Sequence, residues 1–478
     1  AVGWGSLTDN TTGTQNTALG RSALATNTEA SNNTAVGYAA SLSNTTGAQN
    51  TSVGHNTLYA TTTGSNNTGL GQGALQGNTT GSSNTAVGKA SLSVATTASN
   101  NTAVGLNVMA ATTTGELNTA VGSSALTTNT TGANNVAMGF AALQLSTTSS
   151  NNTAIGYAAM NANTTGSENT SVGRNSLDAN TTGSDNTAIG NSALGSNTTA
   201  SHCTAVGSGA LVLSTGAGNT AVGSTAGDAI TTGTNNTALG YEALGKLTTG
   251  GDNVGVGRAS GLDNTTGSGN TSLGVEALEN GNGCNNSVAI GKQAGREITS
   301  GSNLLCLGTS SGNSGSPGGA LTSGNNEVTL GNGDHSKINA QVSITVASDE
   351  RDKTDFQALS AGLDFVNGLT PYTYYWDKRH KYVDWDSNPD TDLNSITHDG
   401  THKEDWMDVG FKAQDVVALE ESVNHKISNK TNLVVSLSGD GKQYALQYEK
   451  FVPILVKALQ EADDKIDALT TRVTTLEG

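Results

Sequence analysis

The chain has 478 residues, a formal net charge of −17, and aromatic residues make up only 4% of it. This charge argues against a nucleic-acid partner, because phosphate binding calls for clustered Lys and Arg. No apolar run approaches membrane-spanning length, and no signal peptide is visible. Three of the four Trp and four of the five Phe lie after residue 348, so a core of large side chains is available only to the C-terminal part.

A repeat of 17 residues fills residues 1–308. Each unit reads Asn-Thr-Ala-Val-Gly, then a short Ala-Leu segment, then Thr-Thr-Gly. The glycine that ends the first motif recurs nineteen times in this register, and one interval shortens to 16 residues before Gly223. Because Ala1-Val2-Gly3 already stands inside a unit, we expect a further segment upstream.

Two apolar columns run through the repeat, one directly before this glycine and one four residues after it. Short apolar segments between glycine and Asn/Thr turns are typical of strands, and β-branched residues beside glycine disfavour a helix. A fixed period of this size predicts a β-solenoid whose stacked coils bury their apolar faces, with Asn and Thr ladders along the outside. At roughly 4.8 Å per coil, 19 coils would span about 90 Å. A disordered linker is the alternative, but disorder does not require an aliphatic residue every 17 positions.

The Asn-Thr-Ala-Val-Gly units resemble the β-roll heads of trimeric adhesins. A thin solenoid buries little surface in each coil, so we expect three chains to associate into a homotrimeric parallel shaft. Near-identical repeats raise a register problem, because sliding one chain by a whole unit leaves most columns matched. A trimeric C-terminal domain would align the ends of the three chains before the shaft forms. The 16-residue coil is a second candidate feature for setting their register.

Two further features of this region are predicted. The three cysteines occupy different columns, so we expect free, buried thiols and no disulfide: Cys203 replaces Asn, Cys306 replaces Ala and Cys284 falls in a turn. Residues 309–347 form a Gly/Ser-rich neck, with strands expected in the segment Glu327–Gly331 and in the alternating run Ile338–Val346.

The segment from Ser348 to Lys353 (Ser-Asp-Glu-Arg-Asp-Lys) carries the candidate chemistry. A serine hydroxyl can attack a peptide bond if a base takes its proton, and a lysine amine serves only when it is neutral. Burial or a neighbouring cation such as Arg351 would favour that form. Neither a helix nor a strand brings residues five apart together, so Ser348 should precede a helix start, or the pair forms between chains. A helix N-terminus capped by Ser348 is the structural alternative.

This segment and Phe356 resemble the opening of the intramolecular chaperone domain of phage tail spikes and fibres, the endosialidase C-terminal type. The resemblance continues through Leu369-Thr370-Pro371-Tyr372 and Trp376, then Val409 to Val416, and ends with Tyr448 to Leu455. It implies an α+β domain over residues 348–478 that trimerises, guides folding of the fibre before it, and then releases itself. By this resemblance the Ala347–Ser348 bond is cut, with Ser348 as nucleophile and Lys353 as base.

Between Asp377 and Asp408 the chain departs from that pattern with an acidic insertion. His398 and His402 would share one face if this stretch were helical and could then bind a metal. Nothing in it looks helical, so a solvated loop is the preferred interpretation, and we expect neither a metal nor a cofactor.

The last helix is predicted over residues 454–477, as a coiled coil. Its apolar residues alternate by four and three, which is a coiled-coil seam flanked by charged residues. The seam consists of Leu455, Leu459, Ala462, Ile466, Leu469, Val473 and Leu476.

The sequence therefore favours a structural phage fibre, located in the virion and outside the cell, whose enzyme activity is at most one self-cleavage. Its expected partners are two further copies of itself, a virion attachment protein and a host receptor. A cell-surface adhesin is the alternative, but no membrane strands follow the coiled coil. An ice-binding solenoid is a third possibility, prompted by the Thr columns. A polysaccharide-cleaving spike needs a paired acid site, and the repeats offer only scattered acids such as Glu116, Glu168 and Asp185.

Overall fold

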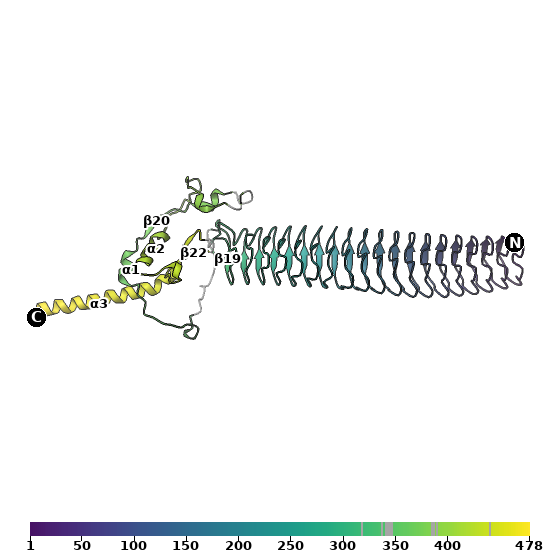
Figure 1. Cartoon of the computed structure of the whole chain (residues 1–478), viewed down its shortest axis with the longest axis horizontal. Helices are drawn as coiled ribbons and strands as arrows, with labels where there is room; N and C mark the ends of the chain where they lie inside the picture. Colours follow the sequence, from purple (N-terminus) through teal and green to yellow (C-terminus); the bar gives the residue numbers. More distant parts are fainter. Residues whose placement is uncertain (317–318, 336–337, 340–347, 384–387, 389–390, 439–440) are drawn as a thin grey trace. The chain divides into compact units, whose positions relative to one another are not determined.

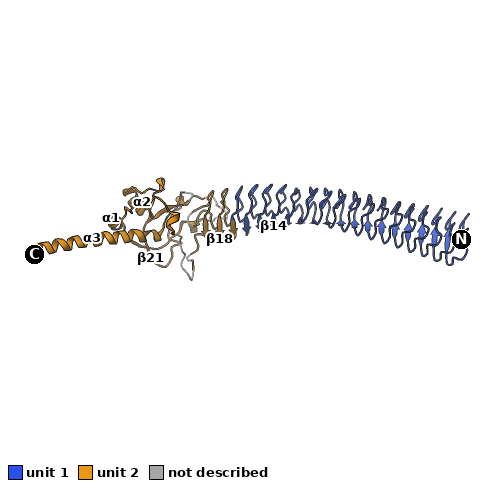
Figure 2. Ribbon diagram, turned by 90° about the horizontal axis from the view of Figure 1, so that it is seen from below, with its two compact units in different colours: residues 1–287 blue, residues 288–478 orange. Residues whose placement is uncertain are grey.

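The computed structural model describes residues 1–316, 319–335, 338–339, 348–383, 388, 391–438 and 441–478. The chain divides into two compact units, residues 1–287 and residues 288–478 (Figure 2).

Unit 1 is a parallel β-solenoid in which each coil from Thr17 onward contributes one three-residue strand, and Val2 forms a single parallel bridge to Leu19 (Figure 1). Consecutive strands pair in parallel with like residues aligned, as Thr34 pairs with Thr51 and Val36 with Val53. The strands are β1 Thr17–Leu19, β2 Thr34–Val36, β3 Thr51–Val53, β4 Thr68–Leu70, β5 Thr85–Val87, β6 Thr102–Val104, β7 Thr119–Val121, β8 Val136–Met138, β9 Thr153–Ile155, β10 Thr170–Val172, β11 Thr187–Ile189, β12 Thr204–Val206, β13 Thr220–Val222, β14 Thr237–Leu239, β15 Val254–Val256 and β16 Thr271–Leu273. The predicted β-solenoid is confirmed.

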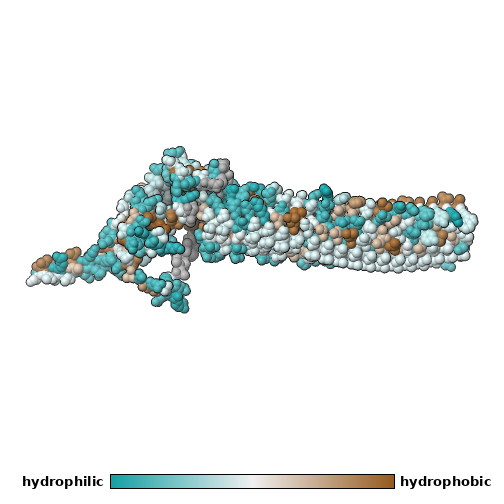
Figure 3. Space-filling view, in the orientation of Figure 1, coloured by the Kyte–Doolittle hydropathy of each residue, from teal (hydrophilic) through white to brown (hydrophobic). Residues whose placement is uncertain are grey.

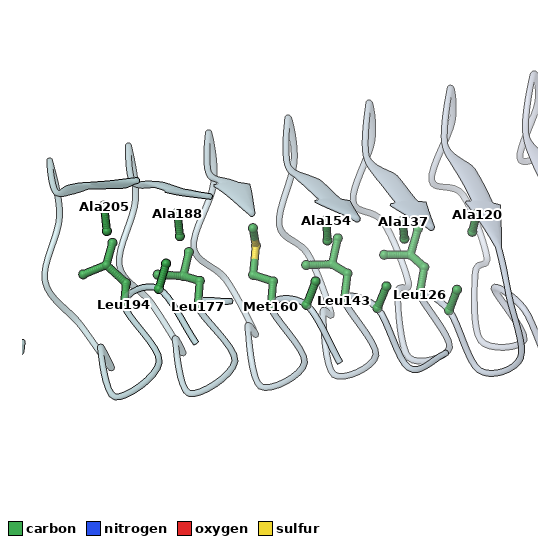
Figure 4. Packing of buried hydrophobic residues seen from close by; sticks show 14 of the residues in the cluster. Ala120, Leu126, Ala137, Leu143, Ala154, Met160, Leu177, Ala188, Leu194 and Ala205 are labelled. Carbon is green, nitrogen blue, oxygen red and sulfur yellow. The ribbon is translucent and has the colours of Figure 1, made fainter. Parts of the chain in front are cut away.

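Small residues and one larger apolar residue per coil fill the interior. The middle residue of each strand, such as Ala137 or Ala154, is buried. It faces the apolar column formed by the residues four positions after each recurrent glycine (Figure 4). Leu126, Leu143 and Met160 in that column are also fully buried. They adopt a left-handed backbone, with φ between 51° and 55°, which costs roughly 1 kcal/mol for a non-glycine residue. Complete burial of the side chain, worth about 1.5–3 kcal/mol, offsets that strain.

The asparagine ladder lies inside the solenoid, not along its outside as the sequence suggested. Asn118, Asn135 and Asn152, each one residue before a strand, are 1% exposed or less. The Asn135 backbone N–H donates to Asn118 Oδ1 at 3.0 Å, and Asn135 Nδ2 donates to the Ser149 carbonyl at 2.9 Å. Each amide thus satisfies backbone groups of neighbouring turns that would otherwise be buried without partners.

Threonine ladders do lie nearer the surface. Thr45 Oγ1 donates to the Thr62 carbonyl at 3.0 Å, one coil along, and Thr62 Oγ1 repeats the bond to Thr79 at 3.2 Å. These threonines are half-buried. The expectation of an outer ladder therefore holds for threonine and is wrong for asparagine.

The aliphatic residue before each glycine also faces outward. Ala35 in the middle of β2 is fully buried, whereas Val36 beside it is only partly buried, and the same inside–outside alternation recurs in every strand of unit 1. Two successive residues of a strand point to opposite faces, so only one of them can enter the core. Of the two apolar columns predicted to pack inside, this one does not.

The recurrent glycine is required by close stacking. Gly37 has φ +134°, and a Cβ there would lie 2.4 Å from the Gly54 carbonyl oxygen of the next coil. Any side chain at this position would therefore force adjacent coils apart.

The 16-residue coil keeps the strand register. Thr204 still pairs with Thr220 and Val206 with Val222, because the missing residue is taken from the turn that contains Thr215. Its role as a register mark stays a prediction.

Unit 2 begins with three more parallel strands, β17 Val288–Ile290, β18 Leu305–Leu307 and β19 Val328–Leu330. The 17-residue period ends at Gly308, but β19 pairs with β18 at a spacing of 23 residues, so the region expected to be a neck supplies another coil. Most of the predicted strand 338–346 lies outside the described residues. The domain boundaries assigned from the sequence stay predictions.

A small α+β region follows. Its strands are β20 Tyr372–Tyr374, β21 Asp408–Gly410, β22 Val435–Leu437 and β23 Tyr444–Leu446, and its helices are η1 Glu350–Asp352, α1 Leu363–Gly368, η2 Arg379–Tyr382, η3 Leu393–Ser395, α2 Ala413–Ser422, η4 Ile427–Asn429, η5 Tyr448–Lys450 and α3 Phe451–Glu477. Large apolar side chains form its core, as the aromatic distribution predicted. The core consists of Ala361, Phe365, Val416, Val434, Val435, Phe451 and Ile454.

The last helix, α3, begins three residues before its predicted start. Phe451, Ile454 and Ala458 near its N-terminus are buried. The apolar seam beyond them is exposed, with Leu459 at 72% and Leu476 at 84%. One chain alone therefore leaves the predicted coiled-coil seam without a partner helix.

Candidate functional site

Ser348 and Lys353 lie side by side. Lys353 Nζ is 2.5 Å from Ser348 Oγ and 3.4 Å from the Ser348 carbonyl oxygen. The short 3₁₀ helix η1, Glu350–Asp352, turns the chain between them, so Ser348 precedes a helix start as the spacing required. The structure thus brings the two residues into hydrogen-bond contact within one chain, while their catalytic role stays a prediction.

Asp349, not Ser348, caps this helix. Its side chain accepts a hydrogen bond from the Arg351 backbone N–H at 2.9 Å. The Ser348 hydroxyl is consequently left to face the lysine amine. The alternative in which Ser348 serves as the N-cap is not what the structure shows.

Arg351 is held by the same aspartate. Its Nη2 lies 2.6 Å from Asp349 Oδ2, and its Nε donates to Asp349 Oδ1 at 3.0 Å. These hydrogen bonds lower the pKa of the Asp349 carboxyl below its usual value. The carboxylate thus neutralises the guanidinium that was considered as a cation acting on Lys353.

The pair is open to solvent in the single chain. Every residue from Ser348 to Gln357 is exposed. Ala347, which supplies the carbonyl of the expected scissile bond, lies outside the described residues.

Two motifs that are far apart in the sequence meet in the sheet beyond this segment. Tyr372 in β20 pairs with Gly410 in β21, and Tyr374 pairs with Asp408. A Cβ at Gly410 would lie 2.5 Å from the Tyr448 hydroxyl, so the close packing of a third motif explains the glycine. Phe411 and Phe451 stack with ring centroids 5.4 Å apart.

The acidic insertion is a loop excursion from these two strands. Where the insertion leaves and rejoins the two strands, Trp376 Nε1 donates to Asp408 Oδ2 at 3.1 Å. Inside it, the Tyr382 hydroxyl donates to Asp377 Oδ1 at 2.8 Å, and the rings of His398 and His402 meet the Tyr382 ring edge to face. Over the described part of the chain, no group of three or more His, Cys, Asp or Glu is arranged to hold a metal ion.

Glu420, on α2, is a buried carboxylate that the sequence reasoning missed. It is 2% exposed and accepts hydrogen bonds from the backbone N–H groups of Leu433, Val434 and Val435 at 2.7–3.0 Å. The available signal was an acid following the apolar run Val416–Leu419. It fixes the start of β22 against α2.

Glu461 of α3 makes a second contact of this kind. Its Oε2 accepts the Leu363 backbone N–H at 2.7 Å at the start of α1, and this bond lowers the pKa of the carboxyl. The long helix is thereby tied to the small domain by a charged hydrogen bond as well as by its apolar first turns.

The comparison with protein families bears on the segment that begins at the serine. Residues 348–424 match the family described as chaperone of endosialidase. Over these residues the chain is similar to domains of this type. The family model is named as that of a peptidase, and its match starts at Ser348 itself. No curated protein matches the chain.

The matched residues include the Ser348–Lys353 pair, β20, the insertion, β21 and α2, and they end before α3. Nothing in this match covers the repeats. No helix among the described residues has the length and apolar character needed to cross a membrane.

Proposed function

We propose that the chain is a structural phage fibre that works as a homotrimer and belongs to the host-recognition apparatus of the virion. Its chaperone domain drives trimerisation and folding of the solenoid, and then cuts the chain before Ser348. The observation that carries the proposal is the 2.5 Å contact between Ser348 Oγ and Lys353 Nζ at the first residues of the family match.

The exposed seam of α3 supports self-association. Leu459, Ile466 and Leu469 are between 58% and 72% exposed, and a coiled coil would bury them. The full seam covers about three heptads, which is long enough for a coiled coil that keeps the ends of the three chains in register. The regular solenoid needs that levelling, because its coils repeat with nearly the same side chains.

The proposed cleavage uses the side chains in the following way. Neutral Lys353 takes the proton of the Ser348 hydroxyl, whose oxygen attacks the carbonyl carbon of Ala347. The C–N bond breaks, the proton passes to the released Ser348 amine, and an ester joins Ala347 to the serine oxygen. Water then hydrolyses the ester, which frees a carboxylate at Ala347 and restores the hydroxyl.

Assembly would supply what the single chain lacks. A lysine amine becomes an effective base when it is removed from water, and Lys353 is exposed in one chain. Packing of the three domains against one another would bury the pair. Cleavage would then follow trimerisation, so the clamp is released only after it has acted.

Intact-mass analysis tests the cleavage. Wild-type protein should yield two fragments, residues 1–347 and 348–478, whereas Ser348→Ala and Lys353→Met should remain whole. Ser360→Ala, which changes another exposed serine of the domain, is the matched control and should be cut normally. A wild-type chain that stays whole after assembly would refute the self-cleavage.

A second expression test addresses the chaperone role. Residues 1–347 produced alone should give aggregates or chains of mixed register, while the full Ser348→Ala chain gives one species. Equal yields of the same single species from both would refute the need for the domain.

A further inference from the structure

Unit 1 carries an unbroken apolar stripe on its outer surface. The stripe is formed by the third residue of each strand, and none of its members is buried. The parallel register places each residue directly against its counterpart in the next coil, as Val104 pairs with Val121. Hydrophobic patches are visible along the shaft in Figure 3. The stripe consists of Leu19, Val36, Val53, Leu70, Val87, Val104, Val121, Met138, Ile155, Val172, Ile189, Val206, Val222, Leu239, Val256 and Leu273.

This stripe is large enough to hold another chain. Leu19, Leu70 and Leu239 are 45–49% exposed. Seven of the sixteen members are 37–49% exposed, and the nine valines are partly exposed. At an average of roughly 40 Å² of apolar surface in water for each side chain, the stripe offers about 600 Å². The threonine that begins most of these strands lies on the same outward face and adds to that area. A standard interface uses about 800 Å² on each partner, so the stripe and its threonines reach that size.

The charges beside the stripe are segregated by sign. We call the positions two residues after each strand the trailing column. It holds four of the five Lys and Arg residues of unit 1 and contains no acid. The leading column, two residues before each strand, contains no Lys or Arg, and its acids are Glu168, Asp185 and Asp252. The basic members of the trailing column are Arg21, Lys89, Arg174 and Arg258. One edge of the stripe is therefore basic and the other is acidic.

Two coils carry both signs at one level. Glu168 and Arg174 flank β10, and Asp252 and Arg258 flank β15; all four are exposed. Within the chain Asp185 lies 3.9 Å from His202, Asn235 Nδ2 donates to Asp252 at 3.3 Å, and Arg258 forms an ion pair with Glu276. Arg258 nevertheless remains 55% exposed, so its guanidinium can still meet a second carboxylate.

We propose that copies of this chain associate along the aliphatic stripe, and that these two charge pairs fix their register. A rotation about an axis parallel to the shaft places the trailing edge of one chain beside the leading edge of the next. In register, Arg174 meets Glu168 and Arg258 meets Asp252 of the neighbouring copy. The inference rests on the proposed homotrimer and adds the surface by which the shafts meet.

A slipped assembly loses at least one of these pairs. A shift of one coil in one direction places Arg174 level with Asp185 but Arg258 level with Gly269. The opposite shift places the two arginines level with Asn151 and Asn235. Only the in-register assembly pairs both arginines with acids. The aliphatic contacts of the stripe change little on such a shift, because each coil presents a similar side chain.

The surface is tested by cross-linking in the full chain that carries Ser348→Ala. Val172→Cys places a thiol on the stripe, and Thr165→Cys places one on another exposed part of the same region as a matched control. Oxidation should join Val172→Cys chains in at least tenfold higher yield than Thr165→Cys chains. Equal yields would overturn the proposal. Cross-links from Val172→Cys only to a different protein, and none between copies of this chain, would overturn it as well.

Charge insertion provides a second measurement. Ile155→Glu with Val172→Glu should raise the rate of proteolysis of the shaft at least tenfold relative to Thr148→Glu with Thr165→Glu. The control positions are exposed and equivalent to Glu29, so an acid is native to that column. Equal sensitivity of the two double variants would contradict the proposal.

The register marks are tested by reversal and compensation. Arg174→Glu with Arg258→Glu should reduce the in-register cross-link several-fold, and adding Glu168→Arg and Asp252→Arg should restore it. No loss on reversal, or no recovery on compensation, would overturn the role of the pairs. Sedimentation separates the two proposals: a monomeric full chain refutes the homotrimer, whereas an oligomer without stripe cross-links refutes the stripe alone.

Discussion

The buried asparagine ladder makes a specific prediction for the substitution Asn152→Ala. Asn152 Oδ1 accepts the Asn169 backbone N–H at 3.0 Å, and Asn152 Nδ2 donates to the Gly166 carbonyl at 3.0 Å. The Gly166 carbonyl also receives Asn163 Nδ2 at 2.9 Å, so it keeps a partner after the substitution. The Asn169 N–H loses the acceptor that Asn152 supplies, deep inside the coil.

The magnitude follows from that one orphaned donor. A buried N–H without an acceptor costs about 1–3 kcal/mol, and the lost side-chain volume adds to it. We therefore expect the local free energy of opening to fall by about 2–3 kcal/mol. Since about 1.4 kcal/mol corresponds to a factor of ten, amide hydrogen exchange around Asn169 should accelerate roughly 30- to 150-fold.

Hydrogen exchange followed by mass spectrometry on the full chain is the appropriate assay, because long repeat arrays do not unfold in a single two-state step. Thr165→Ala, an exposed change in the same coil, is the control and should change exchange less than threefold. Asn152→Cys should be milder than Asn152→Ala, because Cys203 occupies the equivalent position and its Sγ contacts the Gly216 carbonyl at 3.4 Å. If amide hydrogens around Asn169 exchange no faster in Asn152→Ala than in Thr165→Ala, the ladder does not stabilise the coil.

Three further predictions concern other residues. Glu420→Gln should lower the stability of the small α+β region by about 2–3 kcal/mol in urea unfolding, because the Glu420 oxygens accept three backbone N–H groups and the substitution turns one oxygen into a donor. Glu421→Gln, a change at an exposed neighbour, should have little effect. Burial raises the pKa of the Cys284 and Cys306 thiols to about 11, above the ordinary value of 9.0, so the stability they contribute is intact below pH 9 and is lost as pH rises toward 11. Cys284→Ala with Cys306→Ala should remove part of that alkaline loss, and an unchanged pH profile would contradict the assignment. Self-cleavage should accelerate with protein concentration, since assembly is proposed to bury Lys353; a rate per chain that is independent of dilution would argue against this.

Much of the solenoid could be predicted from its period. The glycine register predicts the coil length, and the position of Thr-Ala-Val before it predicts each strand. The direction of side chains could not be predicted as easily, because Val36 and Leu24 look equally apolar in the sequence. Their burial depends on strand alternation and on left-handed backbone at the Leu24 column, and neither is evident from composition. Polarity alone predicts the asparagines on the outside, whereas the need of buried backbone groups for hydrogen-bond partners draws them inside.

In the C-terminal part, the spacing of Ser348 and Lys353 predicted a turn between them, and η1 provides it. The role of Asp349 as both helix cap and partner of Arg351 was not predicted, since an acidic first turn is compatible with several caps. Glu420 was missed because its three partners lie 13–15 residues further along the chain. Such contacts depend on how α2 meets β22, which the local sequence does not reveal.

The central claim, that the chain is one strand of a homotrimeric fibre assembled by its C-terminal domain, is tested most directly by native mass spectrometry of the full Ser348→Ala chain. A homotrimer gives a particle of three chains, each of 47.9 kDa less the mass of one oxygen atom. A folded particle that contains a single chain would contradict it.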